Sequence, residues 1–230
     1  PGDMVNANGF WDQFRLLVPF LNLMYPGMNQ KLQEGLVNAY KESGFLPEWA
    51  SPGHRDCMVG NNSASVVADA YIKGLRGYDI ETLWEALKHG ANAHLRGTAS
   101  GRLGYESYNQ LGYVANNIGI GQNVARTLEY AYNDWAIYTL GKKLGKPESE
   151  IDIYKKHALN YQNVYHPERK LMVGKDNKGV FNPNFDAVDW SGEFCEGNSW
   201  HWSFCVFHDP QGLINLMGGK KEFNNMMDSV

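Results

Sequence analysis

The chain has 230 residues, of which 43% are hydrophobic, and a formal net charge of -4, so it can form one domain with a sizeable core. Its 21 Lys and Arg residues are scattered rather than gathered into a basic stripe, which argues against a nucleic-acid-binding surface. No stretch approaches the roughly 20 apolar residues of a membrane span, and the first residues lack the pattern of a signal peptide. Because the chain starts at Pro1 and not at Met, we expect it to be an internal piece of a longer protein.

Helical periodicity dominates the N-terminal half, where the predicted helices come in pairs. Residues 16–24 predict a helix with one apolar stripe, formed by Leu16, Leu17, Phe20, Leu21 and Met24. Pro19 lies inside this helix and predicts a kink or a lost hydrogen bond. A second helix is expected over residues 28–43, because Gly44 is a stop signal. Two more helices are predicted over residues 63–73 and 79–95. The last of them has one apolar face, formed by Leu83, Trp84, Leu87 and Ala91.

The C-terminal half begins with residues 96–121, which have no period and predict a long loop. Asn123 caps the clearest helix of the chain, which ends at Leu144, and its partner helix is expected over residues 148–165. Residues 175–185 predict a polar turn. Two short helices are expected to close the chain, one over residues 211–217 and one from residue 220.

Sequential helix pairs with longer polar loops between them are typical of an α/α toroid, in which inner and outer helices alternate. We therefore predict an all-α chain that forms an incomplete toroid of the six-hairpin type, with its long loops at the active-site end. About four pairs are present where six are needed, so residues 1–230 are expected to be part of one domain that continues outside this chain. A helical solenoid would show the same pattern, although no repeat of fixed period is found.

Cysteine and histidine spacing gives no sign of a metal site or a disulfide framework. Cys57, Cys195 and Cys205 form no C-x-x-C pair, and their odd number favours unbridged thiols over a Cys195–Cys205 bridge. His201 and His208 are too far apart for a helical zinc pair. They are better interpreted as histidines of the core or of the surroundings of a site.

Glu196 is the best candidate for a chemical role, because it lies in a segment dense in carboxylates, histidines and tryptophans. Phe194, Trp200 and Trp202 give it an apolar setting in which a carboxyl group would keep its proton. A protonated carboxyl beside aromatic rings is what the general acid of a glycosidase requires. The alternative is that Glu196 caps the helix that follows it.

Two other segments contain side chains that could line a pocket. Trp11 and Asp12 lie close to Arg15 in the sequence. An ion pair between Asp12 and Arg15 is the simpler interpretation, and a contact with a sugar is the more specific one. The small and amide residues of the segment 56–61 suit a pocket loop, and they suit a turn before a helix equally well.

Five motifs together resemble glycoside hydrolase family 92, and they occur in the family's order over nearly the whole chain. They are Phe10-Trp11-Asp12-Gln13-Phe14-Arg15, Asp56-Cys57-Met58-Val59-Gly60, Ala68-Asp69-Ala70-Tyr71-Ile72-Lys73-Gly74, Thr127-Leu128-Glu129-Tyr130-Ala131-Tyr132-Asn133-Asp134-Trp135 and Cys195-Glu196-Gly197-Asn198-Ser199-Trp200. The resemblance implies a β-sandwich domain followed by a catalytic toroid. It also implies an exo-acting α-mannosidase of the α-1,2 type, mostly bacterial, that uses calcium and inverts the anomeric centre.

The resemblance also implies roles for individual residues. Glu196 matches the general acid, Trp11 and Asp12 match the pair that lines the sugar pocket, and Asn198 and Trp200 are expected to bind substrate. His201 stands where many relatives have Gln, and Gln13 where Thr is common. By the same resemblance, the partner is an α-mannose-containing glycan, and the whole protein is secreted, periplasmic or on the cell surface.

The family's Gly-Asn-Glu-x-x-His and Gly-Asn-Asp segments, which supply leaving-group contacts and the general base, have no match in this chain. The resemblance therefore places the base and most calcium ligands outside residues 1–230. An inverting glycosidase needs both carboxylates, so the isolated chain is expected to be inactive. Two alternatives stay open: a non-catalytic carbohydrate-binding or scaffold module on the same helices, and a toroid glycosidase that acts on another sugar.

Overall fold

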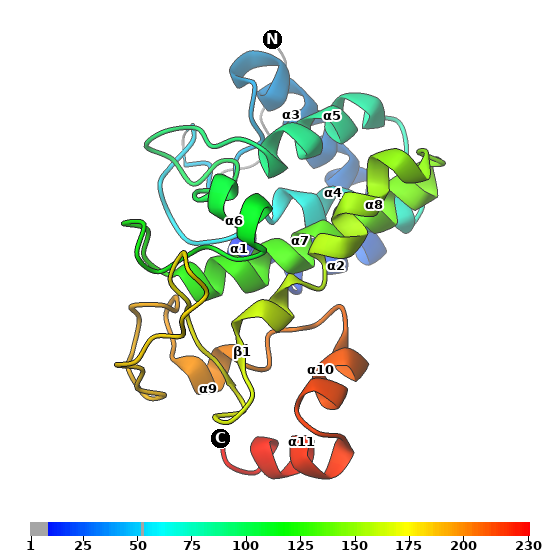
Figure 1. Ribbon diagram of the computed structural model, residues 1–230. Helices are drawn as coiled ribbons and strands as arrows, with labels where there is room; N and C mark the ends of the chain where they lie inside the picture. The colour runs from blue at the N-terminus through cyan, green and yellow to red at the C-terminus, as the bar shows by residue number, and fades with distance from the viewer. Residues whose placement is uncertain (1–8, 52) are drawn as a thin grey trace. The chain divides into compact units, whose positions relative to one another are not determined.

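The computed structural model describes residues 9–51 and 53–230 and consists mainly of α-helices, which confirms the predicted all-α class (Figure 1). The chain divides into two compact units. Unit 1 comprises Pro1–Tyr105 and Asn133–Lys156, and unit 2 comprises Glu106–Tyr132 and His157–Val230. Among the described helices, none has the length and apolar content needed to cross a membrane.

Unit 1 is built from helices whose limits follow local signals in the sequence. Its helices are α1 (Phe10–Gln13), α2 (Leu17–Met24), α3 (Pro26–Ser43), α4 (Ser63–Ile72), α5 (Ile80–Ala91), the C-terminal part of α7 (Asn123–Leu144) and α8 (Glu148–His157). Helix α3 ends as predicted at Gly44, which has a φ of 77°. Helix α5 starts after Asp79, whose side chain accepts a hydrogen bond from the Thr82 backbone N–H.

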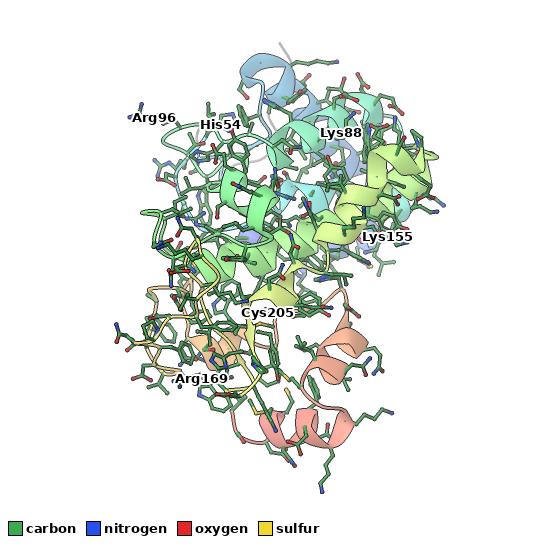
Figure 2. All side chains as sticks on the ribbon, in the orientation of Figure 1. His54, Lys88, Arg96, Lys155, Arg169 and Cys205 are labelled. Carbon is green, nitrogen blue, oxygen red and sulfur yellow. The ribbon has the colours of Figure 1, made fainter. Side chains whose placement is uncertain are left out.

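Packing within unit 1 brings α2 beside α3 and α4, and α3 beside α5 (Figure 1). The predicted apolar face of α5 is confirmed, because Leu83, Trp84, Leu87 and Ala91 are buried. The carboxylate of Glu150 on α8 accepts hydrogen bonds from Trp84 Nε1 at 2.8 Å and from the Nζ of Lys88, which Figure 2 labels, at 2.7 Å. These contacts tie α5 to α8 through one carboxylate.

Helix α2 differs from its prediction in two ways. It begins at Leu17, so Pro19 lies in the first turn, where a backbone N–H has no partner within the helix and its loss is harmless. The apolar stripe that predicted the helix does not pack inward, because Leu16 and Met24 are 74% and 55% exposed.

The inward face of α2 combines the apolar Val18 with the amide of Asn22. Asn22 is buried and donates a hydrogen bond to the Asp69 carboxylate of α4 at 2.6 Å. It also accepts from Asn29, which in turn accepts from Gln33 at 3.2 Å. Periodicity identified the helix but could not tell which face packs inward.

Unit 2 contains short elements joined by long ordered loops. They are α6 (Tyr105–Leu111), the N-terminal part of α7, the 3₁₀ helix η1 (Asn160–Val164), β1 (Tyr165–His166), β2 (Leu171–Met172), α9 (Ser199–Trp202), α10 (Pro210–Leu216) and α11 (Lys220–Met227). Strands β1 and β2 pair antiparallel, with Tyr165 opposite Met172. The predicted turn near residue 175 is confirmed by a bridge between Lys175 and Phe181.

Two predictions for this part of the chain are wrong. The loop expected over residues 96–121 contains α6, because fully buried Tyr108 packs edge-on against Tyr130 at 5.4 Å and stabilises a helix too short for a periodic signal. The helix expected to reach Tyr165 ends at His157. After His157 the chain forms η1 and then β1. The carbonyl of Val164 accepts a backbone hydrogen bond and Met172 pairs with β1, so the backbone groups of this segment are satisfied by a hairpin and not by a helix.

Candidate functional site

Glu196 lies on a short turn between buried residues, with its own side chain exposed. Its φ of 46° is in the left-handed region, which is uncommon for a residue other than glycine. Such a conformation costs on the order of 1–3 kcal/mol and persists only where surrounding contacts enforce it. The predicted apolar enclosure is not present around Glu196, because Phe194 and Trp202 turn into the core.

Hydrogen bonds to both neighbours of Glu196 hold this turn. Trp202 Nε1 donates to the carbonyl of Cys195 at 2.9 Å, and the backbone N–H of Ser191 donates to the carbonyl of Gly197 at 2.9 Å. The carboxylate therefore projects from a backbone that is fixed on each side. This rigidity suits a group that must meet one atom of a bound substrate.

Helix α9 begins directly after the turn, and Asn198 caps it. The Asn198 Oδ1 accepts from the His201 backbone N–H at 3.3 Å, while His201 Nδ1 accepts from the Asn198 N–H at 3.2 Å. The alternative in which Glu196 caps this helix is therefore wrong, since Asn198 occupies the cap. Trp200 lies half-buried on the same short helix.

The β1–β2 hairpin anchors α9. Ser199 Oγ donates to the carbonyl of Met172 at 2.6 Å, and the Met172 N–H donates to Ser203 Oγ at 2.8 Å. Both serines are fully buried. The hairpin, which sequence patterns did not predict, thus sets the position of the Glu196 turn.

A second carboxylate, Glu193, organises the loops that precede the turn. It accepts hydrogen bonds from Asn116 Nδ2 at 3.1 Å, Asn182 Nδ2 at 3.3 Å and the Gly174 N–H at 3.0 Å. A Cβ atom on Gly174 would lie 2.1 Å from its carboxylate, so a larger residue there would displace the carboxylate. Sequence reasoning did not single out Glu193, because its partners are far apart in the chain.

A hollow of about 370 Å³ adjoins Glu193. It is lined by Asn116, Gly119, Ile120, Gly121, Asn123, Asn182, Gly192 and Glu193. Three amide side chains and one carboxylate lie in this lining beside glycines and Ile120, so it offers hydrogen-bonding groups next to apolar surface.

Trp11 and Asp12 lie on α1 in unit 1, at a tightly packed entrance to the helix. Trp11 is half-buried and Asp12 is exposed. The Arg15 guanidinium lies over the Trp11 ring, 5.3 Å from its centroid, which is a cation–π distance. Gly9 precedes the helix, and a Cβ there would lie 1.9 Å from Cε3 of Trp49. The position of Trp11 thus depends on that glycine.

The predicted site residues belong to different units. Trp11 and Asp12 are part of unit 1, while Glu196, Asn198 and Trp200 are part of unit 2. Within unit 2 the last three share one turn and the first turn of α9. The roles assigned to all five by resemblance stay predictions.

The segment 56–61 is a turn before a helix, and its last residues join a buried polar network. The Glu48 carboxylate accepts from the Ser63 N–H at 3.0 Å, from Ser63 Oγ at 2.5 Å and from Asn61 Nδ2 at 2.8 Å. It therefore caps the start of α4. The Glu48 carbonyl also accepts from the Phe10 N–H at 2.9 Å, so the same residue positions α1 with Trp11 and Asp12.

Burial raises the pKa of Glu48 to about 7 from the ordinary 4.5, and its hydrogen bonds offset part of this effect. The folded state therefore keeps a proton on Glu48 at pH values where the unfolded chain has lost it. Below pH 4.5 Glu48 is protonated in both the folded and the unfolded state, so its burial as a charged group does not lower the stability of unit 1. As pH rises to about 7, the stability of unit 1 is expected to fall by about 3 kcal/mol, and the loss is complete above that pH.

Glu48→Gln is expected to remove this part of the pH dependence, because the substituted amide does not titrate. Hydrogen exchange of α4 in the full-length protein, followed from pH 5 to pH 8, measures the effect. The control is Glu42→Gln, which changes an exposed glutamate on α3. A wild-type pH profile in Glu48→Gln would contradict the assignment.

The structure also shows where the histidines and cysteines lie. His208 Nε2 lies 2.7 Å from the carbonyl of Ala158, and its ring packs edge-on against Tyr161 at 5.7 Å, so it is a core residue. Cys57, Cys195 and Cys205, the last labelled in Figure 2, are all unbridged. No group of three or more His, Cys, Asp or Glu side chains suited to a metal ion occurs within residues 9–51 and 53–230.

A helical fold with an exposed, firmly held glutamate can serve many functions, so the class of protein follows from comparison with known proteins. A family model described as the glycosyl hydrolase family 92 catalytic domain matches residues 2–230. The chain therefore belongs to glycosyl hydrolase family 92.

Solved structures and a curated relative agree with this assignment. A family 92 inverting mannosidase from Bacteroides thetaiotaomicron is 48% identical, with a TM-score of 0.93 over 96% of this chain and 30% of that chain. An α-mannosidase of the same family and organism, solved with mannoimidazole, is 32% identical, with a TM-score of 0.88 over 96% of this chain and 29% of that chain. A protein of Arthroderma benhamiae, described as an uncharacterized secreted glycosidase, is 30% identical over 99% of this chain and 32% of its own length. The chain thus spans about a third of the length of these relatives.

Proposed function

We propose that the chain is part of the catalytic domain of an exo-acting α-mannosidase of the α-1,2 type, which hydrolyses its substrate with inversion and depends on calcium. Family membership and the two mannosidase structures at 48% and 32% identity support this proposal. In the whole protein, this part would complete an α/α toroid that follows a β-sandwich domain. Its partners would be α-mannose-containing glycans.

Glu196 is the general acid in this proposal. Its carboxyl group gives a proton to the glycosidic oxygen as the bond to the anomeric carbon breaks. The observation that carries this role is the exposed Glu196 side chain on a turn held at Cys195 and Gly197. Trp11, Asp12, Asn198 and Trp200 would bind the sugar.

The general base and the calcium ligands would come from the rest of the protein. In an inverting glycosidase, the base lies roughly 6.5–9.5 Å from the acid and activates water on the opposite face of the sugar. The two family segments that supply leaving-group contacts and the general base have no match in this chain, which supports a base outside it. The described residues offer no group of three or more carboxylate, thiol or imidazole side chains for a metal, so we assign no calcium ligand here. Secretion of the whole protein is proposed because one relative is described as secreted.

Assays of the full-length protein test this function. We expect release of mannose from α-1,2-linked mannosides but not of glucose from α-glucosides, with β-mannose seen first by proton NMR. A calcium chelator should abolish the reaction and added calcium should restore it. The isolated 230-residue chain should release no mannose, because it has the acid without the base.

Several results would contradict the proposal. Equal activity on glucosides would favour a glycosidase for another sugar. Binding of mannosides without hydrolysis would favour a non-catalytic carbohydrate-binding module. Mannose release by the isolated chain would show that both carboxylates lie within it.

A further inference from the structure

Trp190 is an exposed aromatic residue next to the Glu196 turn that the proposed mechanism does not use. Trp190 is 64% exposed, although tryptophan residues are on average largely buried. Its ring meets the His201 ring edge-on, with the centroids 5.7 Å apart and the planes at 82°. An edge contact covers little of a ring, so most of Trp190 stays open to a ligand.

The backbone around Trp190 is joined to the backbone around Glu196. The N–H of Ser191 donates to the carbonyl of Gly197 at 2.9 Å, so the residue after Trp190 lies against the residue after Glu196. His201 connects the same two segments from the other side, since its Nδ1 accepts from the Asn198 N–H at 3.2 Å. Trp190 is therefore a fixed neighbour of Glu196, and not a side chain on a loose loop.

Backbone strain is concentrated at this junction. Ser191 has a φ of 74° and Glu196 a φ of 46°, and both conformations are unfavourable for residues with a side chain. The Ser191–Gly197 hydrogen bond therefore joins the backbone that follows Trp190 to the backbone that follows Glu196. Strain of this kind is typical of ligand-binding turns, where a precise placement is worth its cost.

We propose that Trp190 is the platform on which the leaving-group sugar of the glycan stacks, a role that rests on the proposed α-mannosidase function. Aromatic rings bind the C–H faces of sugars, and an indole offers the largest such surface. An exo-acting enzyme encloses the terminal sugar, while the rest of the glycan extends into solvent. The exposed ring of Trp190 suits the solvent side, and Glu196 beside it would protonate the oxygen that joins the two sugars.

The test compares two substrates in the full-length enzyme. α-1,2-Mannobiose has a leaving-group sugar, whereas α-mannosyl fluoride has none. Trp190→Ala should raise KM for mannobiose about tenfold with little change in kcat, because stacking contributes to binding. It should leave both constants for mannosyl fluoride within about twofold of the wild type. Trp190→Phe, which keeps a smaller ring, should raise KM for mannobiose less than Trp190→Ala.

Val188→Ala is the matched control, because Val188 is also 64% exposed on the same loop and has no aromatic ring. It should change neither substrate. If Trp190→Ala does not fold, the substrate comparison in Trp190→Phe decides the matter. A wild-type KM for mannobiose in both Trp190→Ala and Trp190→Phe would overturn the proposed platform. An equal loss of kcat/KM on both substrates would also overturn it, and would indicate a structural role for Trp190. Failure of the wild-type enzyme to cleave either mannoside would instead reject the proposed function.

Discussion

Glu196→Gln in the full-length enzyme is expected to lower kcat/KM for α-1,2-mannobiose by about 10² to 10⁴, the usual contribution of a general acid. Mannobiose has a poor leaving group, whose oxygen needs a proton as the bond breaks. A dinitrophenyl mannoside has a good leaving group that departs without one. Its turnover should therefore fall less than about tenfold. The side chain is exposed and has no capping role, so the substitution should leave folding intact.

Steady-state kinetics on both substrates measure this difference, with Glu168→Gln as the control. Glu168 is an exposed glutamate in the turn between β1 and β2, away from the Glu196 turn in sequence. An equal loss on both substrates would argue that Glu196 is not the acid. External azide or formate should not rescue the variant on mannobiose, because the missing function is protonation and not nucleophilic attack.

Asp134→Ala is expected to destabilise unit 1 by about 3–5 kcal/mol, because it removes a carboxylate that pairs with the buried guanidinium of Arg102. Arg102 Nη2 lies 2.8 Å from Asp134 Oδ1, and the two side chains are 1% and 0% exposed. The pair joins the loop after α5 to the middle of α7. The melting temperature of the domain should fall on the order of 10 °C.

Calorimetry of the full-length protein, with hydrogen exchange of α7, measures this loss. Glu148→Ala is the control, since it breaks an exposed pair with Lys142 and should leave the melting temperature unchanged. The double variant Arg102→Met with Asp134→Leu should recover much of the stability, because apolar side chains remove both buried charges. No loss in Asp134→Ala would show that the pair is not a structural centre of the unit.

Local signals were sufficient to locate most helices. Asp79 accepts from the Thr82 N–H, and Gly44 adopts the left-handed conformation that ends α3, as their residue types predict. These interactions join residues a few positions apart, so the sequence alone contains them. Periodicity failed for α6, whose seven residues depend on the burial of Tyr108. For α2 it identified the helix but not the face that packs inward, because the neighbours of a helix face depend on distant parts of the chain.

For the candidate site too, the local sequence predicted some features, and others depended on contacts between distant residues. The residue types around Glu196, together with the order of five motifs, were enough to indicate the family and to single out one carboxylate. They could not show that Glu196 is exposed, that Asn198 occupies the helix cap, or that Ser191 and Gly197 are hydrogen-bonded. They also missed Glu193 and Trp190.

The local sequence therefore determines which chemical group the chain presents, since a glutamate followed by Gly-Asn can form a sharp turn from which a carboxyl group projects. Its surroundings are decided by contacts between distant residues. Glu193 meets Asn116 across 77 positions, and Met172 meets Ser203 across 31. Such contacts form because folding buries these groups together, and only the tertiary structure shows that the segment bearing Trp190 is hydrogen-bonded to the turn bearing Glu196.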